Sequence, residues 1–262
     1  MNEEKSLVGQ VIDQSSGVLE KAYDDLAHPS AKSLGNTLSL VPRTIGVWLG
    51  KWEKWVINGE ESIRLTAQAV QEKAKNIPEE KLTEPEPYVA IPAVQQLSYC
   101  YDSEELRNMY ANLLVSAMNQ DTKMNVHPGF TSIINQLSPL DIKALECIKS
   151  NRGAITTVSL YLMSKDETYI ELVRDYSINL KDIIWDVKMQ SATLHNLKRL
   201  GIVNVRYDRQ IKPDEVYDVY KTDSVFIEQE KENTDAEKHI ELVRGVVEFT
   251  EFGIAFCNAC CD

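Results

Sequence analysis

The sequence predicts a mainly α fold, with a helical N-terminal domain over residues 1–137 and an α+β, winged-helix-like domain over residues 138–262. Three observations lead to this prediction. Apolar residues recur at helical spacing through most of the first half. Directly after Gly201 the spacing changes to the alternation that is typical of strands. A second alternating segment, 243–249, then leads into a final helix from Thr250, which gives the helix–strand–strand–helix order of a winged helix-turn-helix.

Three helical stretches are predicted within the first 76 residues. Apolar residues at steps of three and four predict a first helix that ends at His28-Pro29. A second helical stretch is interrupted at Pro42, because proline removes a hydrogen-bond donor and clashes with the preceding turn. A third helix should end near Asn76. The acidic segment from Pro78 to Pro87 lacks periodicity, so we expect a linker.

The helix from about Asp102 to Met118 has the clearest pattern. Asp102 is a candidate N-cap, and Glu105 can reach back to complete a capping box. The following apolar residues keep helical spacing without interruption: Leu106, Met109, Tyr110, Leu113, Leu114, Ala117 and Met118. We therefore expect this helix at the centre of the N-terminal domain.

A second start signal opens the C-terminal domain. Ser138 is placed at the cap, Pro139 at the first helical position and Asp141 in the first turn of a helix that should run to about Ser150. Residues 155–162 are β-branched and aromatic and predict a strand. The remaining predicted elements are a short helix at 180–185, a longer helix that ends at Gly201, and strands at 202–207 and 243–249.

Four short motifs follow one another in the middle of the chain. They are Glu86-Pro87-Tyr88-Val89-Ala90-Ile91-Pro92-Ala93, the segment Asp102–Leu114, His127-Pro128-Gly129-Phe130, and Gln136-Leu137-Ser138-Pro139-Leu140-Asp141. This succession resembles the abortive infection alpha family of bacterial proteins. The family-like positions are Glu105, Arg107, Tyr110, Asn112, Leu113, His127, Pro128, Ser138 and Pro139. The resemblance implies a role in defence against phage and supplies no mechanism, because the family is otherwise treated as a domain of unknown function.

Three tryptophans form the most distinctive candidate interaction surface. Trp48, Trp52 and Trp55 fall on one helical face, with Lys51 beside them. Tryptophan favours the membrane interface, where its ring is buried and its N–H stays hydrated. The face could lie on a bilayer once it is released, or it could pack in the core or against a second subunit. Packing is the commoner role of such a stripe.

No residue pattern identifies a catalytic or metal site. His127 has no nucleophile near it in the sequence, so a capping or hydrogen-bonding role is expected. Cys257, Cys260 and Cys261 have the spacing of half a zinc site, but there is no second Cys-x-x-Cys pair to complete four ligands. Phosphate loops, dinucleotide fingerprints and nucleophile elbows are absent from the sequence. We therefore expect no cofactor and no catalytic residue.

Basic residues near the predicted wing raise the question of nucleic-acid binding. Lys198 and Arg199 lie on the candidate reading helix, and Arg206 and Arg209 lie on the candidate wing. Against this, residues 138–262 contain 16 Lys and Arg and 22 Asp and Glu, a net charge of −6. Because winged helices also serve as protein-contact modules, the negative charge favours a protein partner or a second copy of the chain over nucleic acid.

The composition is that of a globular protein, with 43% apolar and 26% charged residues and a net charge of −12. The acidic start, the five cysteines and the lack of a long apolar run predict a reduced, cytoplasmic protein. The tryptophan face would allow it to associate with a membrane on activation. The leading hypothesis is an anti-phage protein that acts by binding or conformational change. The alternatives are a nucleic-acid-binding regulator and, third, a hydrolase or nuclease.

Overall fold

The structure is a computed structural model that describes residues 60–97, 100 and 103–261. The chain divides into two units, Met1–Gly50 and Lys51–Asp262, and the described residues all belong to the second unit. The two helices predicted before residue 59 and the tryptophan face, with Trp48, Lys51, Trp52 and Trp55, lie outside the described residues.

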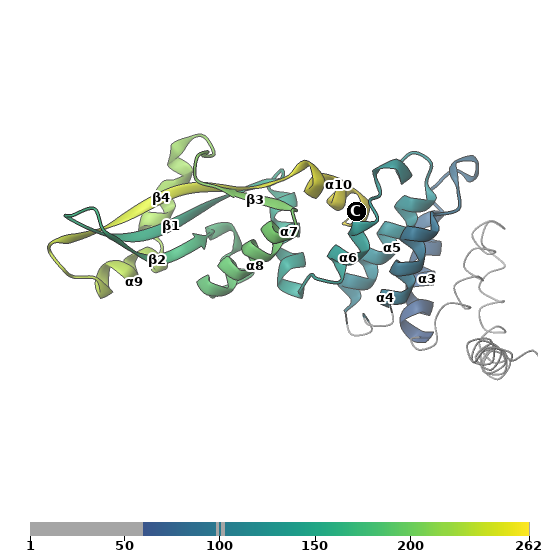
Figure 1. The fold of residues 1–262 in the computed structure, drawn as a ribbon, viewed down its shortest axis with the longest axis horizontal. Coiled ribbons are helices and arrows are strands. Elements are labelled where there is room, and N and C mark those ends of the chain that lie inside the picture. The colour runs from purple at the N-terminus through teal and green to yellow at the C-terminus, as the bar shows by residue number, and fades with distance from the viewer. Residues whose placement is uncertain (1–59, 98–99, 101–102, 262) are drawn as a thin grey trace, which may run out of the picture. The chain divides into compact units, whose positions relative to one another are not determined.

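One part of the described chain consists of packed helices, which we call the helical region (Figure 1). Its helices are α3 (Glu60–Ala74), α4 (Pro87–Leu97), α5 (Glu104–Met118), α6 (Gly129–Ile134) and the C-terminal α10 (Glu251–Cys260). Helix α5 contacts all four of the others. Its side chains Tyr110, Leu113 and Leu114 are fully buried, as their helical spacing predicts. The expected central role of α5 is confirmed.

The rest of the described chain, the sheet region, contains one antiparallel sheet of four strands in the order β2-β1-β4-β3. The strands are β1 (Ala154–Ser164), β2 (Tyr169–Tyr176), β3 (Val203–Arg206) and β4 (Lys238–Phe249). The helices of this region are α7 (Pro139–Ser150), α8 (Val187–Arg199) and α9 (Ser224–Glu232). Short 3₁₀ helices lie at η2 (Glu79–Lys81), η3 (Lys123–Asn125), η4 (Ile178–Leu180) and η5 (Asp214–Thr222).

The two faces of β1 have different neighbours. Val158 and Leu160 pack in a core with Tyr217 and Tyr220 of η5, and Val225 and Phe226 of α9 flank that core. Since side chains alternate along a strand, Ser159 points to the opposite face, where α8 packs. The segment between β3 and β4 therefore covers one face of the sheet, and α8 covers the other.

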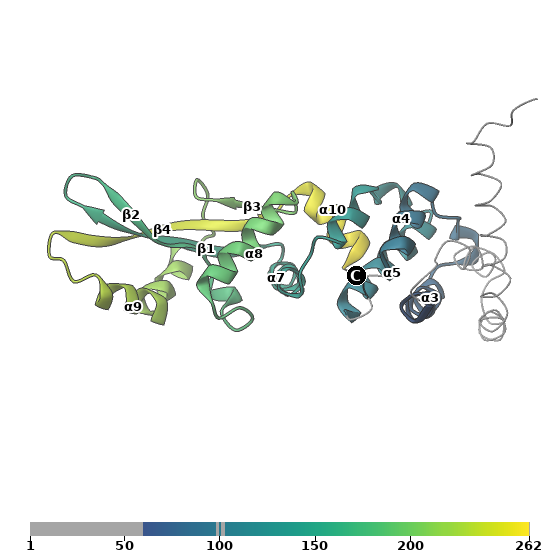
Figure 2. The ribbon, with the colours of Figure 1, turned by 60° about the horizontal axis from the view of Figure 1, so that its bottom comes forward.

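Helix α10 joins the two regions, because it follows β4 directly and packs on α5 (Figure 2). Thr250 caps α10 by accepting a hydrogen bond from the Gly253 N–H. A Cβ atom on Gly253 would lie 2.0 Å from the Ile202 carbonyl oxygen, so only glycine allows this approach. The start of α10 is thereby fixed against the turn that precedes β3.

Several sequence predictions are confirmed. Helix α8 is followed by Gly201 with φ of 75°, and β3 pairs with β4 as expected for the two predicted strands. The strand predicted at 155–162 is β1, and the third N-terminal helix is α3. Ser138 is the N-cap of α7, with Pro139 and Asp141 in the first turn, as predicted, and Ser138 and Asp141 also form a capping box.

Other predictions need correction. The described residues form a mixed α/β fold, not a mainly α one: β2, η5 and α9 were not anticipated. The N-cap of α5 is Ser103 and not Asp102, because the Ser103 hydroxyl accepts the hydrogen bond from Leu106 N–H. Only η4 forms near the helix expected at 180–185. The expected linker contains η2, and Leu82 forms a β-bridge with Asn119, so this segment packs back on the end of α5.

Candidate functional site

The contact between α5 and α10 is made by polar side chains that bind backbone carbonyls. The Asn112 Nδ2 donates to the Cys260 carbonyl over 2.9 Å, and the Ser116 hydroxyl donates to the Ala259 carbonyl over 3.1 Å. The last carbonyls of a helix have no partner within it, so these two side chains satisfy groups that would otherwise face solvent or remain unpaired. The end of α10 is therefore held by α5 through specific hydrogen bonds.

A cavity of about 280 Å³ lies beside this contact. Its described lining comes from α3, α5 and α10 and the turn after α3, through Lys73, Asn76, Asn112, Val115, Ser116, Asn258 and Ala259. Buried Asn112 Oδ1 has no hydrogen-bond partner among the described residues. We call this space the junction cavity.

A second cluster, the Asp175 network, connects three strands or their ends to α8. Asp175 Oδ1 accepts a hydrogen bond of 2.6 Å from the Tyr207 hydroxyl, and its Oδ2 lies 3.2 Å from His195 Nε2. The Ser159 and Tyr207 hydroxyls are 2.6 Å apart, and Ser159 Oγ also accepts the Asp175 N–H. Burial, followed by the hydrogen bond to Asp175, raises the pKa of Tyr207, so this phenol stays a donor.

Asp175 occupies an unusual position. Its φ is 52°, its side chain is 5% exposed, and His195 on α8 is 46% exposed. A positive φ at a residue other than glycine is strained, and it persists where surrounding contacts hold it. Here the contacts with Tyr207 and Ser159 hold the Asp175 carboxylate beside α8, and the carboxylate orients the His195 ring. The arrangement fixes α8 to the sheet and leaves one histidine facing solvent.

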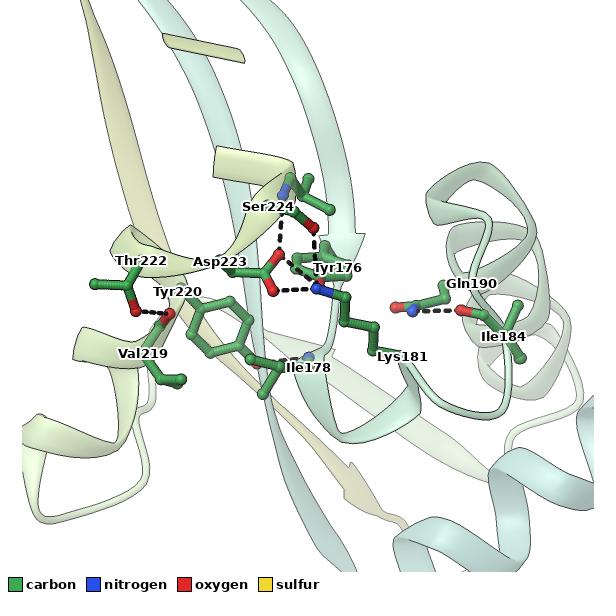
Figure 3. Close-up of polar contacts among 11 residues, drawn as sticks. Tyr176, Ile178, Lys181, Ile184, Gln190, Val219, Tyr220, Thr222, Asp223 and Ser224 are labelled. Carbon is green, nitrogen blue, oxygen red and sulfur yellow. Dashed lines mark hydrogen bonds and ion pairs between the residues drawn. The ribbon is translucent and has the colours of Figure 1, made fainter. Parts of the chain in front are cut away.

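A third cluster anchors the η5–α9 segment (Figure 3). Asp223 is the N-cap of α9, accepts a hydrogen bond of 2.9 Å from the Tyr176 hydroxyl and pairs with Lys181. Lys181 also donates to the Ser224 hydroxyl over 3.0 Å, so it reaches between two consecutive residues of the α9 start. Burial favours a raised pKa for Asp223, but the hydrogen bonds from Lys181, the Val225 N–H and Tyr176 outweigh it, and the pKa is lowered.

The family-like residues on α5 have mainly structural positions. Glu105 is exposed in the first turn, where its own backbone N–H and Ser103 lower its pKa by hydrogen bonding. Arg107 donates to the Cys100 carbonyl over 3.2 Å. The buried Tyr110 hydroxyl donates to the Thr131 carbonyl over 3.2 Å, and Leu113 is fully buried. Asn112 binds α10 through the Cys260 carbonyl.

His127 has a hydrogen-bonding role, one of the two roles that the sequence predicted. Its Nδ1 accepts a hydrogen bond of 3.0 Å from the Gly129 N–H at the start of α6, directly after Pro128. Its ring packs edge-on against Phe252 of α10, with centroids 5.5 Å apart. Ser138 and Pro139 lie at the start of α7.

Most of the candidate nucleic-acid contacts are engaged within the chain. Arg206 pairs with Asp208, and Arg209 lies 2.9 Å from Glu248. Arg199 donates to Gln136 and Asn196 on the surface of α8. Lys198 is exposed. The structure therefore brings together no continuous row of available cations at the predicted wing in the part of the chain that it describes.

Comparison with known proteins assigns most of the chain to one family. A model of the family described as abortive infection alpha matches residues 58–260, most of the chain. The chain belongs to the abortive infection alpha family. Membership suggests abortive-infection-type defence and specifies no mechanism.

Two other comparisons add little to the family assignment. One solved structure, an uncharacterized protein from the hydrocarbon-degrading marine bacterium Alcanivorax borkumensis SK2, is 18% identical and has a TM-score of 0.34. The match covers 55% of this chain and 96% of that one. No curated protein matches the chain.

The described residues of this abortive infection alpha protein contain neither a metal-binding group nor a membrane-spanning helix. Within 60–97, 100 and 103–261 no group of three or more His, Cys, Asp or Glu side chains is placed to hold a metal ion. Cys257 and Cys260 are buried, and burial raises the Cys260 pKa well above its ordinary value. None of the described helices is both long enough and apolar enough to cross a membrane.

Sequence reasoning missed the partners of Asn112 in the junction cavity. Asn112 and Ser116 are spaced i, i+4 on a helix whose other face is apolar, so they share one side of it. That polar pair could have been recognised as a contact face. Lys73 and Asn258 are 185 residues apart in the sequence, and only the packing of α10 on α5 brings them to one cavity.

Proposed function

We propose that this abortive infection alpha protein defends bacteria against phage by binding a trigger and changing conformation, with no catalytic step of its own. The observation that supports the proposal is the position of α10. This helix continues from β4 at one end and is held by Asn112 and Ser116 of α5 at the other. A change in the sheet region would therefore alter the contact of α10 with the helical region.

We further propose a domain boundary near residue 138 and a winged-helix-like, protein-contact role for residues 138–262. Helix α8 is followed by β3, which pairs with β4 in antiparallel fashion, and this succession supports the assignment. The internal pairing of Arg206 and Arg209 argues for a protein partner or a second copy of the chain rather than nucleic acid. The protein would act in the cytoplasm, and release of the face formed by Trp48, Trp52 and Trp55 would supply the effector.

The first test compares two double variants of α5 in cells challenged with phage. The docking variant, Asn112→Ala with Ser116→Ala, removes both hydrogen bonds to α10. The matched surface variant, Glu104→Ala with Asn108→Ala, changes two exposed residues on the same helix. We expect the docking variant to fold, as judged by circular dichroism, and to lose protection, whereas the surface variant keeps it. Full protection by a folded docking variant would refute the proposal.

The second test separates the effector mechanisms during infection. Membrane potential and nucleic-acid integrity are followed together in cells that carry the gene. Depolarisation that is lost in a folded Trp52→Lys variant supports the tryptophan face as effector, because a charged side chain disfavours burial in the bilayer interface. Degraded nucleic acid or altered nucleotide pools, abolished by His127→Ala, would instead indicate an enzyme. A duplex-binding affinity that falls steeply with salt would indicate a nucleic-acid-binding regulator.

A further inference from the structure

We propose that the edge of β4 beyond the end of β3 pairs with the same edge of a second copy of the chain, so that the two sheets join into one. Strand β4 is 12 residues long, and β3 pairs only with its last four residues, 246–249. Residues 238–244 therefore have a strand on one side only, that of β1 (Figure 1). We call their other side the open edge. The inference rests on the proposed protein-contact role of the sheet region and names its partner and its surface.

The even-numbered residues of β4 direct their backbone groups to the open edge. Near the end of the strand, Phe249 N–H donates to the Gly153 carbonyl, directly before β1. Successive residues of a strand direct their N–H and C=O groups to opposite sides, and β4 pairs with β1 without a register shift. Ile240 and Leu242 therefore direct these groups away from β1. On that side neither residue has a hydrogen-bond partner within the part of the chain that the structure describes.

The two borders of the sheet differ in how well they are protected from pairing. The other border is β2, whose pairing with β1 has two register shifts, one between Val158 and Leu160 and one between Leu160 and Tyr161. Such bulges twist an edge strand away from a further strand. The pairing of β4 with β1 has no such irregularity. A regular, unpaired edge is a template for another strand, so β4 is the border that can accept one.

An added strand would also cover apolar side chains. Ile240 and Leu242 are half-buried and flank the core that lies between β1 and the η5–α9 segment. A strand beside them would remove more of their surface from water, which favours association. The odd-numbered neighbours His239 and Glu241 lie on the opposite face of the sheet and are exposed. The open edge therefore combines an apolar face with a polar one.

The polar face selects a second copy as the added strand. Two copies of one edge pair in antiparallel fashion about a two-fold axis, so one residue lies opposite itself. When this residue is Ile240, His239 lies opposite Glu241 of the second copy, and the same pair occurs again across the axis. A histidine and a carboxylate directly opposite each other favour pairing. Centring the pairing on Glu241 would instead place two carboxylates opposite each other, which opposes it.

Sedimentation velocity of the full chain tests the assembly. The paired segment is short, so we expect a weak, reversible dimer. His239→Glu places a carboxylate opposite Glu241, and Glu241→Lys places an ammonium opposite His239, so each variant should raise the dissociation constant of the dimer about tenfold. A mixture of the two variants should dimerise again, because the introduced carboxylate then lies opposite the introduced ammonium.

Glu228→Lys, which changes an exposed charge on α9, is the control and should leave the dissociation constant unchanged. Circular dichroism establishes that each variant is folded. A wild-type chain that stays monomeric up to about 1 mM overturns the proposal. A dimer that is weakened by neither His239→Glu nor Glu241→Lys overturns it as well.

Amide hydrogen exchange identifies the paired backbone groups. The outward N–H groups of Ile240 and Leu242 should exchange more slowly as the protein concentration rises, and His239→Glu should abolish this dependence. The N–H groups of His239 and Glu241 point to β1 and should be protected at every concentration. Slow exchange of Ile240 and Leu242 at all concentrations would mean that the same chain covers the edge, and fast exchange in a dimer would place the interface elsewhere. Either result overturns the proposal.

The oligomeric state and protection from phage separate this inference from the proposed function. If the chain is monomeric while the docking variant still loses protection, only this inference falls. If the chain dimerises through the open edge and the folded docking variant protects, the inference stands and the proposed function falls.

Discussion

The helical region and the sheet region differ in whether their buried polar groups have hydrogen-bond partners. In the sheet region, Asp175 and Asp223 are each enclosed by donors from several elements. In the helical region, Asn112 Oδ1 and Thr131 Oγ1 are buried without a partner among the described residues. Closed polar networks make a structure rigid, whereas a buried acceptor without a partner carries the cost of its lost hydration. The sheet region is therefore held by closed networks around its buried carboxylates, whereas the helical region carries the cost of two unpaired oxygens.

Helix α10 crosses this division. By sequence it extends β4, and by packing it belongs to the helices around α5. The same helix is fixed by the close approach of Gly253 to Ile202 at its start and by hydrogen bonds from α5 at its end. Toward the sheet region α10 is held at its start, and its other end is held by the two hydrogen bonds from α5 and by a hydrogen bond of 3.1 Å from Lys149 Nζ of α7 to the Cys261 carbonyl. The end of α10 therefore has contacts with both regions.

The largest expected effect comes from the core of the helical region. Leu113→Ala should lower the free energy of unfolding by about 2–5 kcal/mol, because it leaves a cavity around a fully buried position. Urea unfolding, with the exposed Asn108→Ala as control, measures the loss. A change no larger than that of Asn108→Ala would show that α5 is not the centre of the helical region's core.

A smaller loss should follow from the start of α10. Gly253→Ala places a methyl group against the Ile202 carbonyl, and overpacking of this kind costs about 1–3 kcal/mol. Because the clash is with backbone, the start of α10 must move. We expect the substitution to accelerate amide hydrogen exchange in α10 more than in α5. Unchanged exchange in α10 would show that this end is not the fixed point.

The sequence predicted the elements whose signals are local. The apolar spacing of α5, the cap at Ser138 and the stop at Gly201 each depend on a few neighbouring residues, and each is present in the structure. The cap of α5 was misplaced by one residue, since Asp102 and Ser103 are both good caps and only geometry selects between them.

The elements that escaped prediction depend on contacts between distant residues. Strand β2 contains Glu171, Arg174 and Asp175 among its apolar residues, so its alternation is broken, and pairing with β1 creates the strand. The candidate site was missed for the same reason. Asn112 was singled out as family-like, but its partner Cys260 lies 148 residues away. No periodicity reports such a contact.

The sheet region provides the next prediction. Asp223→Ala should lower the free energy of unfolding by about 1–3 kcal/mol, because Tyr176 and Lys181 lose their partner and α9 loses its cap. Asp235→Ala, at an exposed carboxylate that also pairs with lysine, is the control. If the two variants unfold alike, the Asp223 cluster does not anchor the η5–α9 segment.

The same carboxylate predicts a dependence on pH. The folded pKa of Asp223 is lower than its usual 3.8, so its ionised form stabilises the folded state above that value. The contribution is lost as the pH falls through the lowered folded pKa. The difference in stability between the wild type and Asp223→Asn should therefore be constant near neutral pH and shrink below about pH 4. A difference that persists unchanged into strong acid would show that the charge of Asp223 is not what stabilises the cluster.

The smallest effect is expected at the predicted wing, where Arg206 pairs with Asp208 in solvent. Exposed ion pairs add little to stability, so Arg206→Gln should leave the thermal midpoint unchanged. The substitution should nevertheless raise the pKa of Asp208 from about 2 toward its usual 3.8, since the hydrogen bond from Arg206 is the main cause of the lowering. An NMR titration of the carboxylate measures this shift. Because Asp208 already occupies the guanidinium, Arg206→Gln should also leave any affinity for DNA unchanged. A marked loss of DNA affinity in this variant would mean that Arg206 exchanges Asp208 for phosphate, and the protein-contact role of the sheet region would then give way to nucleic-acid binding.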